Sequence, residues 1–196
     1  MKIKSFSVTL LNVIINWHGE GCYKISASDA TIIVDPHFSN GVGGRLKGDI
    51  VIKTTVSLPL DISTIEESVI IMAGEYDALG VKIKGTQVFS DDANLKTIYK
   101  AVVDGISFGF LGNIDFELNE KALDDLGQID ILFVPSNNMS GKLIKLISPN
   151  IAIPGWGDPA IVITETGQKP EPIEKLVIKK KDIEANEGFR LIVLQS

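Results

Sequence analysis

The chain has 196 residues, of which 44% are hydrophobic and 22% are charged, and its formal net charge is −6 at pH 7. This length and apolar content are enough for one sizeable core, so we expect a single domain over residues 1–196. The acidic balance, with a pI near 5.0, gives no electrostatic reason to bind nucleic acid or an anionic membrane surface.

The first predicted element is a strand over Ser7–Ile15. A basic start followed by an apolar run is also typical of signal sequences, but Asn12 and Asn16 interrupt the run and no small-residue cleavage site follows. No apolar stretch approaches the roughly 20 residues needed to cross a bilayer. The single cysteine, Cys22, cannot form an internal disulfide. We therefore expect a cytoplasmic protein that makes no membrane contact.

Strands predominate in the rest of the chain, as short runs rich in β-branched residues that are separated by turn residues. The pair Asp104-Gly105 lies between two such runs and predicts a two-residue hairpin turn, because these residues tolerate the positive φ angles of that turn. The further predicted strands are Cys22–Ser26, Thr31–Val34, Ile50–Lys53, Val69–Met72, Val81–Thr86, Ile98–Val103, Ile106–Leu111, Ile131–Val134 and Ile151–Ile153.

Helices are predicted at Asn119–Leu126, at Gly141–Ile147 and, as a short element, at Ile62–Glu67. The first begins with an asparagine suited to the N-cap and stops before a glycine, and the second has apolar residues at helical spacing. Residues Thr164–Pro172 have the composition of a surface loop. Strands, a helix and strands again, repeated in two halves, favour a two-sheet sandwich flanked by helices.

Several motifs follow one another along nearly the whole chain. WHGEGCYKI (17–25) is similar to an opening strand written W-x-G-(H/Q)-(A/S)-C-F, and IIVDPHF (32–38) to a strand that ends in Asp-Pro. GEYDALGVKIKG (74–85) matches the block G-E-Y-x-x-x-G-V-x-I-x-G. In this order, together with a hairpin ending GFLGNID (109–115) and the strand IAIPGW (151–156), they resemble the metallo-β-lactamase superfamily.

Within that superfamily the chain resembles the small predicted Zn-dependent hydrolases of the UlaG-like and NAPE-PLD-like branch. The resemblance implies an α/β (α+β) fold, the four-layer αββα sandwich, in which EKLVIKKKDI (174–183) forms a C-terminal hairpin. It also implies hydrolysis at one or two zinc ions, held by a His-x-His-x-Asp-His loop, a later His, a bridging Asp and a final His.

In this chain none of the positions that the resemblance aligns with zinc ligands carries a strong zinc ligand, which would be an imidazole, a thiolate or a carboxylate. Only two histidines, His18 and His37, are present. We therefore expect no zinc and no other cofactor here, although active relatives use zinc. The aligned positions, which we predict to be vacated, are Thr55, Ser57, Pro59, Leu60, Ser90, Asn113 and Trp156.

Two functions remain open. The first is a degenerate, non-catalytic domain that acts as a binding or assembly module, pairing with itself or with an active paralogue; in it Trp156 fills the vacated pocket or, as the alternative, is exposed for a partner. The second is a hydrolase of the same superfamily with a relocated, weak mononuclear metal site or an acid/base pair. That residual cleft would use His18, Glu20, Asp35, His37 and Asp91, with a structural, turn-capping role for Asp35 as the alternative.

Overall fold

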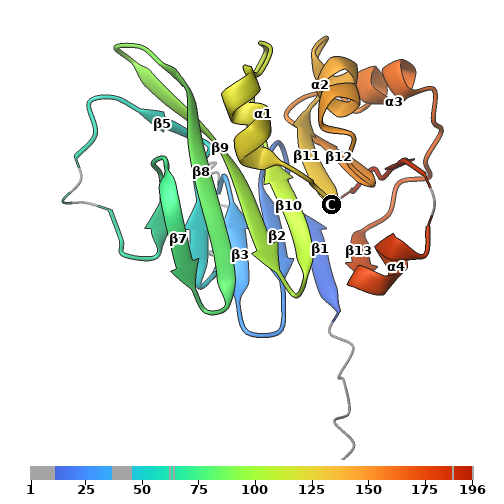
Figure 1. The fold of residues 1–196 in the computed structure, drawn as a ribbon, viewed down its shortest axis with the longest axis horizontal. Coiled ribbons are helices and arrows are strands. Elements are labelled where there is room, and N and C mark those ends of the chain that lie inside the picture. The colour runs from blue at the N-terminus through green and yellow to red at the C-terminus, as the bar shows by residue number, and fades with distance from the viewer. Residues whose placement is uncertain (1–11, 37–45, 62, 64, 187, 196) are drawn as a thin grey trace, which may run out of the picture.

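The computed structural model describes residues 12–36, 46–61, 63, 65–186 and 188–195, which fold into two β-sheets and a small number of helices (Figure 1). The strands are β1 (Val13–Trp17), β2 (Tyr23–Ser26), β3 (Thr31–Val34), β4 (Ile50–Ile52), β5 (Thr55–Ser57), β6 (Val69–Ile70), β7 (Gly74–Ala78), β8 (Val81–Ser90), β9 (Asn94–Val103), β10 (Ile106–Phe110), β11 (Ile131–Pro135), β12 (Ile151–Gly155), β13 (Lys175–Ile178) and β14 (Arg190–Leu191). The helices are α1 (Glu120–Leu126), α2 (Ser140–Ile147), α3 (Ala160–Thr166) and α4 (Lys180–Glu184).

The six-stranded sheet has the order β13-β1-β2-β3-β4-β6, and its register explains how it builds the core. The pairs Ile15↔Ile25, Ile25↔Ile32 and Ile32↔Ile50 place isoleucines from four strands side by side in one row. Their side chains are at most 3% exposed and belong to the cluster between the sheets. Because side chains alternate along a strand, this row leaves the intervening residues to the other face.

The eight-stranded sheet has the order β14-β12-β11-β10-β9-β8-β7, with β5 paired to β9 off this path. Its inner face carries Phe108, Phe110 and Phe133, whose rings stack on one another between the sheets. Its outer face packs against α1, α2 and α3 through a second apolar cluster. Strand β11 is therefore buried at every residue, as expected for a strand covered on both faces.

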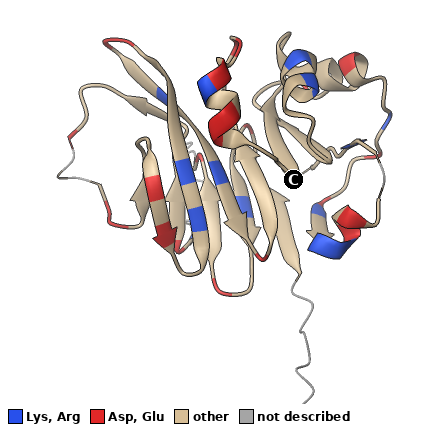
Figure 2. Ribbon diagram, in the orientation of Figure 1, with Lys and Arg blue, Asp and Glu red and all other residues tan. Residues whose placement is uncertain are grey.

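Strand β7 forms an edge of this sheet and presents charges to the solvent (Figure 2). The antiparallel register places Glu75 opposite Lys84 and Asp77 opposite Lys82 on β8. Opposite charges that face each other across a strand pair stabilise the pairing modestly. The opposite charges that face each other across β7 and β8 thus add a modest attraction to the backbone hydrogen bonds of the edge strand.

Most predicted elements are confirmed, and the two-sheet α/β sandwich is confirmed with them. The Asp104-Gly105 turn has the expected positive φ angles of 49° and 76°. Helix α1 begins after Asn119, whose side chain accepts a hydrogen bond from the Ala122 amide, and ends before Gly127. For the strand predicted over 7–15, residues 1–11 lie outside the described residues, and β1 begins at Val13.

Two predicted features are wrong, and a third lies partly outside the described residues. Of the short helix predicted over 62–67, residue 63 lies in a 3-10 turn and residues 65–67 are not helical, while residues 62 and 64 are not described. The loop predicted over 164–172 begins inside α3, because Val162 is buried and anchors that helix on the larger sheet. The C-terminal hairpin is a strand, β13, followed by helix α4, because the Asp182 carboxylate accepts a hydrogen bond from the Lys179 amide and caps the first turn.

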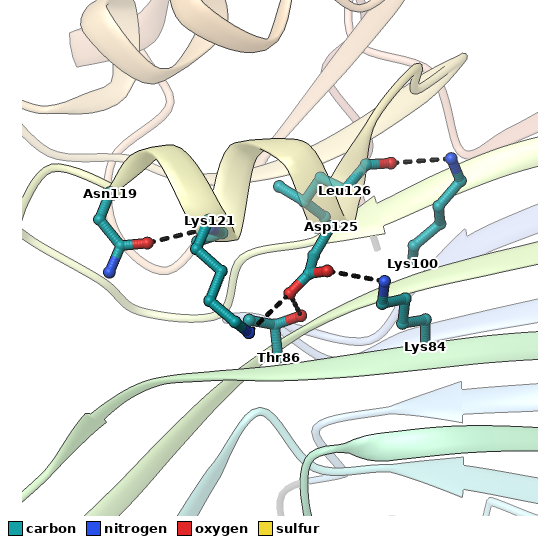
Figure 3. A network of polar contacts seen from close by, with 8 residues as sticks. Lys84, Thr86, Lys100, Asn119, Lys121, Asp125 and Leu126 are labelled. Carbon is teal, nitrogen blue, oxygen red and sulfur yellow. Dashed lines mark hydrogen bonds and ion pairs between the residues drawn. The ribbon is translucent and has the colours of Figure 1, made fainter.

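A polar network holds α1 on the outer face of the sheet (Figure 3). The Asp125 carboxylate pairs with the Lys84 ammonium at 2.7 Å and with Lys121 at 3.1 Å, and it accepts a hydrogen bond from the Thr86 hydroxyl at 3.1 Å. Lys84, then Lys121 and Thr86, lower the pKa of Asp125 to about 2. At the same, C-terminal end of the helix, the Lys100 ammonium donates to the Leu126 carbonyl.

This network predicts a pH dependence of stability. Since the pKa of Asp125 is lower in the folded chain than its ordinary value of 3.8, its contacts stabilise the fold fully above about pH 4 and are lost as the pH falls towards about 2. We expect Asp125→Asn to lower the free energy of unfolding at pH 7 and to flatten its decline between these pH values, measured by urea unfolding. Asp124→Asn, one residue earlier on the exposed side of α1, is the control; equal effects of the two variants would contradict this role.

Candidate functional site

The ends of β3, β4, β10 and β12 meet at one end of the sandwich, where the aligned metal positions were expected. Gly21 and residues in or directly after β2 (Tyr23–Ser26), β3, β10, β11 and β12 line a small cavity of about 10 Å³. That volume holds at most one water molecule, which needs roughly 10–15 Å³. The lining residues are Gly21, Tyr23, Val34, Asp35, Phe110, Gly112, Phe133, Val134, Gly155 and Trp156.

Asp35 ties two of these strand ends together. Its buried carboxylate accepts a hydrogen bond of 2.7 Å from the Thr54 amide and one of 2.6 Å from the Thr54 hydroxyl. A Cβ atom at Gly112 would lie 2.2 Å from that hydroxyl oxygen, so only glycine fits against it. Asp35 thus has a structural role, but it holds the segment that follows β4 rather than the turn amides after its own strand, where the capping role was predicted. Thr54 was missed by the sequence analysis, since its neighbour Thr55 was the aligned residue.

Trp156 covers this end of the sandwich. Its indole ring lies on the backbone of Gly21, where a Cβ atom would be 1.9 Å from the indole Nε1. The Trp156 side chain is half-buried, and its backbone is held at a φ of 53°. Beneath it, the Tyr23 hydroxyl donates to the Pro154 carbonyl at 2.9 Å, and burial, followed by the charge of Asp35, raises the pKa of Tyr23.

The other aligned positions lie elsewhere. Thr55 and Ser57 belong to β5, which pairs with β9 in the register Thr55↔Lys96 and Ser57↔Asn94. Opposite residues of an antiparallel pair point to the same face, so Thr55 shares a face with Lys96. Among the aligned positions, all within the described part of the chain, only Trp156 lines the cavity. Pro59 is exposed and Leu60 half-buried in the segment that follows β5.

The remaining aligned positions, Ser90 and Asn113, are both exposed. The carbonyl of Asn113 accepts a hydrogen bond of 2.8 Å from the Lys96 ammonium. That ammonium also lies 5.8 Å from the centre of the Phe89 ring and 5.9 Å from that of Phe116. A lysine held by a carbonyl and two aromatic rings therefore lies beside two of the aligned positions.

The described residues of the predicted residual cleft do not come together in one site. His18 and Glu20 are exposed, and partial desolvation, then the nearby Lys24 charge, lower the pKa of His18. Asp91 lies in the turn between β8 and β9, where its carboxylate accepts hydrogen bonds from the backbone amides of residues 93 and 94. Asp35 is committed to the turn after β4, and His37 lies outside the described residues.

The side chains present do not fit a zinc site. The aligned positions offer hydroxyls, an amide and apolar groups, whereas zinc in proteins is bound by imidazole, thiolate or carboxylate. Within the described ranges, no group of three or more His, Cys, Asp or Glu residues is placed to hold a metal ion. The single cysteine, Cys22, is buried. No helix in the described part of the chain has the length and apolar character to span a membrane.

The sequence profile of a family described as "Beta-lactamase superfamily domain" matches residues 14–154. No curated protein matches the chain significantly. The fold is similar to that of a protein from Thermotoga maritima assigned to the Zn-dependent hydrolases of the metallo-β-lactamase superfamily. The TM-score is 0.74 at 20% identity, with 93% of this chain and 98% of that chain covered.

Two further solved structures share the fold. Igni18, a metallo hydrolase from Ignicoccus hospitalis, has a TM-score of 0.63 at 15% identity, covering 86% of this chain and 99% of that one. The metallo-β-lactamase fold protein YhfI from Bacillus subtilis has a TM-score of 0.58 at 10% identity, covering 95% and 97%. At these identities the likeness concerns the fold alone, and it confirms the expected αββα sandwich type.

Thr54→Val tests the hydrogen bond between the Thr54 hydroxyl and the Asp35 carboxylate, which joins the ends of β3 and β4. Removing the hydroxyl deprives a buried carboxylate of a donor, so we expect the free energy of unfolding to fall by about 1.5–3 kcal/mol. Thr55→Val is the matched control, because the neighbouring side chain points to the other face of β5, and it should change stability by less than about 0.5 kcal/mol. Urea unfolding of both variants measures the difference, and equal losses would show that the Asp35 contact is unimportant.

Trp156→Ala tests the packing of the indole ring against Gly21. The ring is half-buried, so we expect a loss of about 2 kcal/mol, below the roughly 3–5 kcal/mol of a fully buried tryptophan. Gly21→Ala should also destabilise, since its Cβ would collide with the ring, yet it should cost almost nothing further in the Trp156→Ala background. Chemical unfolding of the two single variants and the double variant measures this coupling; strictly additive losses would mean that the ring does not rest on Gly21.

Proposed function

The chain belongs to the beta-lactamase superfamily, and we propose that within it the protein is a non-catalytic binding or assembly module rather than a zinc hydrolase. The observation that carries this proposal is the seat of Trp156, whose indole ring lies on Gly21 at the strand ends where the superfamily's site is expected. A fold stable through its own packing can keep its shape while the chemistry at its strand ends changes.

The donor chemistry supports the same proposal. A catalytic zinc keeps three protein ligands and one open position for water. Here Thr55 and Ser57 lie on the same face of the β5–β9 pair as Lys96, and the Asp35 carboxylate holds Thr54. With the Trp156 ring in place, the space beneath it is about 10 Å³, too small for an organic substrate. We accordingly propose that the aligned ligand positions have been vacated and that no zinc is bound.

The finer assignments follow from the sequence. We propose that the chain comes from the UlaG-like and NAPE-PLD-like branch, because its motifs follow that order, and that it works in the cytoplasm without nucleic acid or membrane partners. Assembly with a second copy or with an active relative is the partner class that suits a non-catalytic domain of an enzyme superfamily. Light scattering of the purified protein, alone and mixed with such a relative, measures this assembly.

Metal content tests the central proposal. The protein is purified without chelator or affinity tag, incubated with zinc and with manganese, desalted and analysed by elemental mass spectrometry. We expect less than about a tenth of an equivalent of either metal, because the aligned positions supply no strong ligands. A zinc metallohydrolase of the superfamily, handled in parallel, controls for metal lost during purification.

The contrary result is equally specific. Retention of close to one equivalent, abolished by His37→Ala or by Asp35→Asn, would replace the proposal with a relocated mononuclear site. Hydrolytic activity towards ester, lactone and phosphodiester substrates would then be screened with the metal-loaded protein. Retention that survives both substitutions would place a metal elsewhere in the chain and would equally overturn the proposal.

A further inference from the structure

We propose that Trp156 is a movable gate, and that the seat of its indole ring is a binding site for small planar aromatic molecules that carry an N–H group. This inference rests on the proposed non-catalytic function, because it gives the altered strand ends a ligand of their own. The present occupant of the site is the chain's own indole, which indicates the chemistry that the site accepts.

The backbone around the ring is strained. Trp156 has a φ of 53°, a left-handed conformation that is unfavourable for a bulky residue. Asp35, with a φ of 43°, lines the same cavity, and the carbonyl of Glu20, with a φ of 45°, lies 3.2 Å from the Cβ position of Gly155. Strained residues of this kind gather at ligand sites and switches. Gly157, directly after the tryptophan, has a φ of 116°, a conformation that residues with side chains rarely adopt.

The ring can leave without dismantling the core. Trp156 belongs to neither of the two apolar clusters that the described residues form, and its side chain is half-exposed. It rests on Gly21, which has no side chain there to separate the ring from the backbone. Moving the indole outward therefore uncovers this seat and leaves the packing between the sheets in place.

The uncovered seat has a defined chemistry. Beneath it lie the rings of Tyr23, Phe110 and Phe133, with the Tyr23 and Phe133 centroids 4.4 Å apart. The Asp35 carboxylate lines the same cavity; besides the two hydrogen bonds that it accepts from Thr54, a carboxylate can accept others, so a ligand N–H would share this acceptor with Thr54. Aromatic rings prefer offset or edge-to-face contact with other rings. A planar aromatic molecule with an N–H donor satisfies both features.

The test follows the two tryptophan side chains by NMR. The ¹⁵N-labelled full chain, kept in EDTA, is titrated with unlabelled indole, and the Nε1–H signals of Trp17 and Trp156 are assigned with Trp17→Phe. We expect the Trp156 signal to move saturably towards that of an exposed indole while the Trp17 signal stays. Benzofuran, which has the same shape without the N–H, should bind about tenfold more weakly, because a hydrogen bond to a charged acceptor is lost.

Two variants sharpen the result. Trp156→Gly removes the competing ring and its backbone strain, so it should bind indole at least about tenfold more tightly than the unaltered protein. Gly21→Ala places a methyl group 1.9 Å from the position of the indole Nε1, so it should displace the Trp156 signal without ligand and abolish indole binding. The unaltered chain alone already decides the proposal if either variant does not fold.

The gate is overturned if indole leaves the Trp156 signal unmoved, or moves it no more than benzofuran does. It is also overturned if Trp156→Gly binds indole no better than the unaltered chain. Because EDTA removes metal from these titrations, their outcome is independent of the metal measurement. Retention of a metal in the metal-content measurement would overturn the proposed non-catalytic function. An unmoved Trp156 signal in the indole titration would overturn only the proposed gate.

Discussion

The hydrogen bonds between the Asp35 carboxylate and Thr54 are the contact on which the arrangement of the strand ends depends. Strand β3 delivers the carboxylate, and β4 delivers the amide and hydroxyl that it holds. A buried carboxylate is stable only when donors satisfy it, so the turn after β4 is fixed in place. That turn leads directly into β5, whose pairing with β9 directs Thr55 and Ser57 onto the face of Lys96.

Much of the fold was predictable because its signals are local. Alternating isoleucines, the Asp104-Gly105 turn and the asparagine before α1 each specify their own element within a few residues. The short strand β5 was not predictable, because it exists only through its pairing with Asn94–Lys96, far along the chain. Helix α4 was mistaken for half of a hairpin for a similar reason: Ile183 makes it a helix by packing into the core between the sheets.

The candidate site was predictable in its chemistry and less so in its geometry. The residue types at the aligned positions were readable from the motifs, whereas their directions were not. Trp156 is the one aligned residue at the cavity, and its seat on Gly21 depends on a contact between residues far apart in sequence. The position of Lys96 was not predictable either, since nothing local distinguishes it from the other lysines of β8 and β9.

The charged edge strand β7 has a consequence for aggregation. If two copies approached edge to edge in antiparallel fashion with Tyr76 opposite Tyr76, Glu75 of each would lie beside Asp77 of the other. Like charges in that position oppose the continuous sheet that would otherwise grow from an open edge, a common protection in β-rich proteins. Edge-to-edge pairing through β7 in this register is therefore opposed by charge, which favours assembly through another surface.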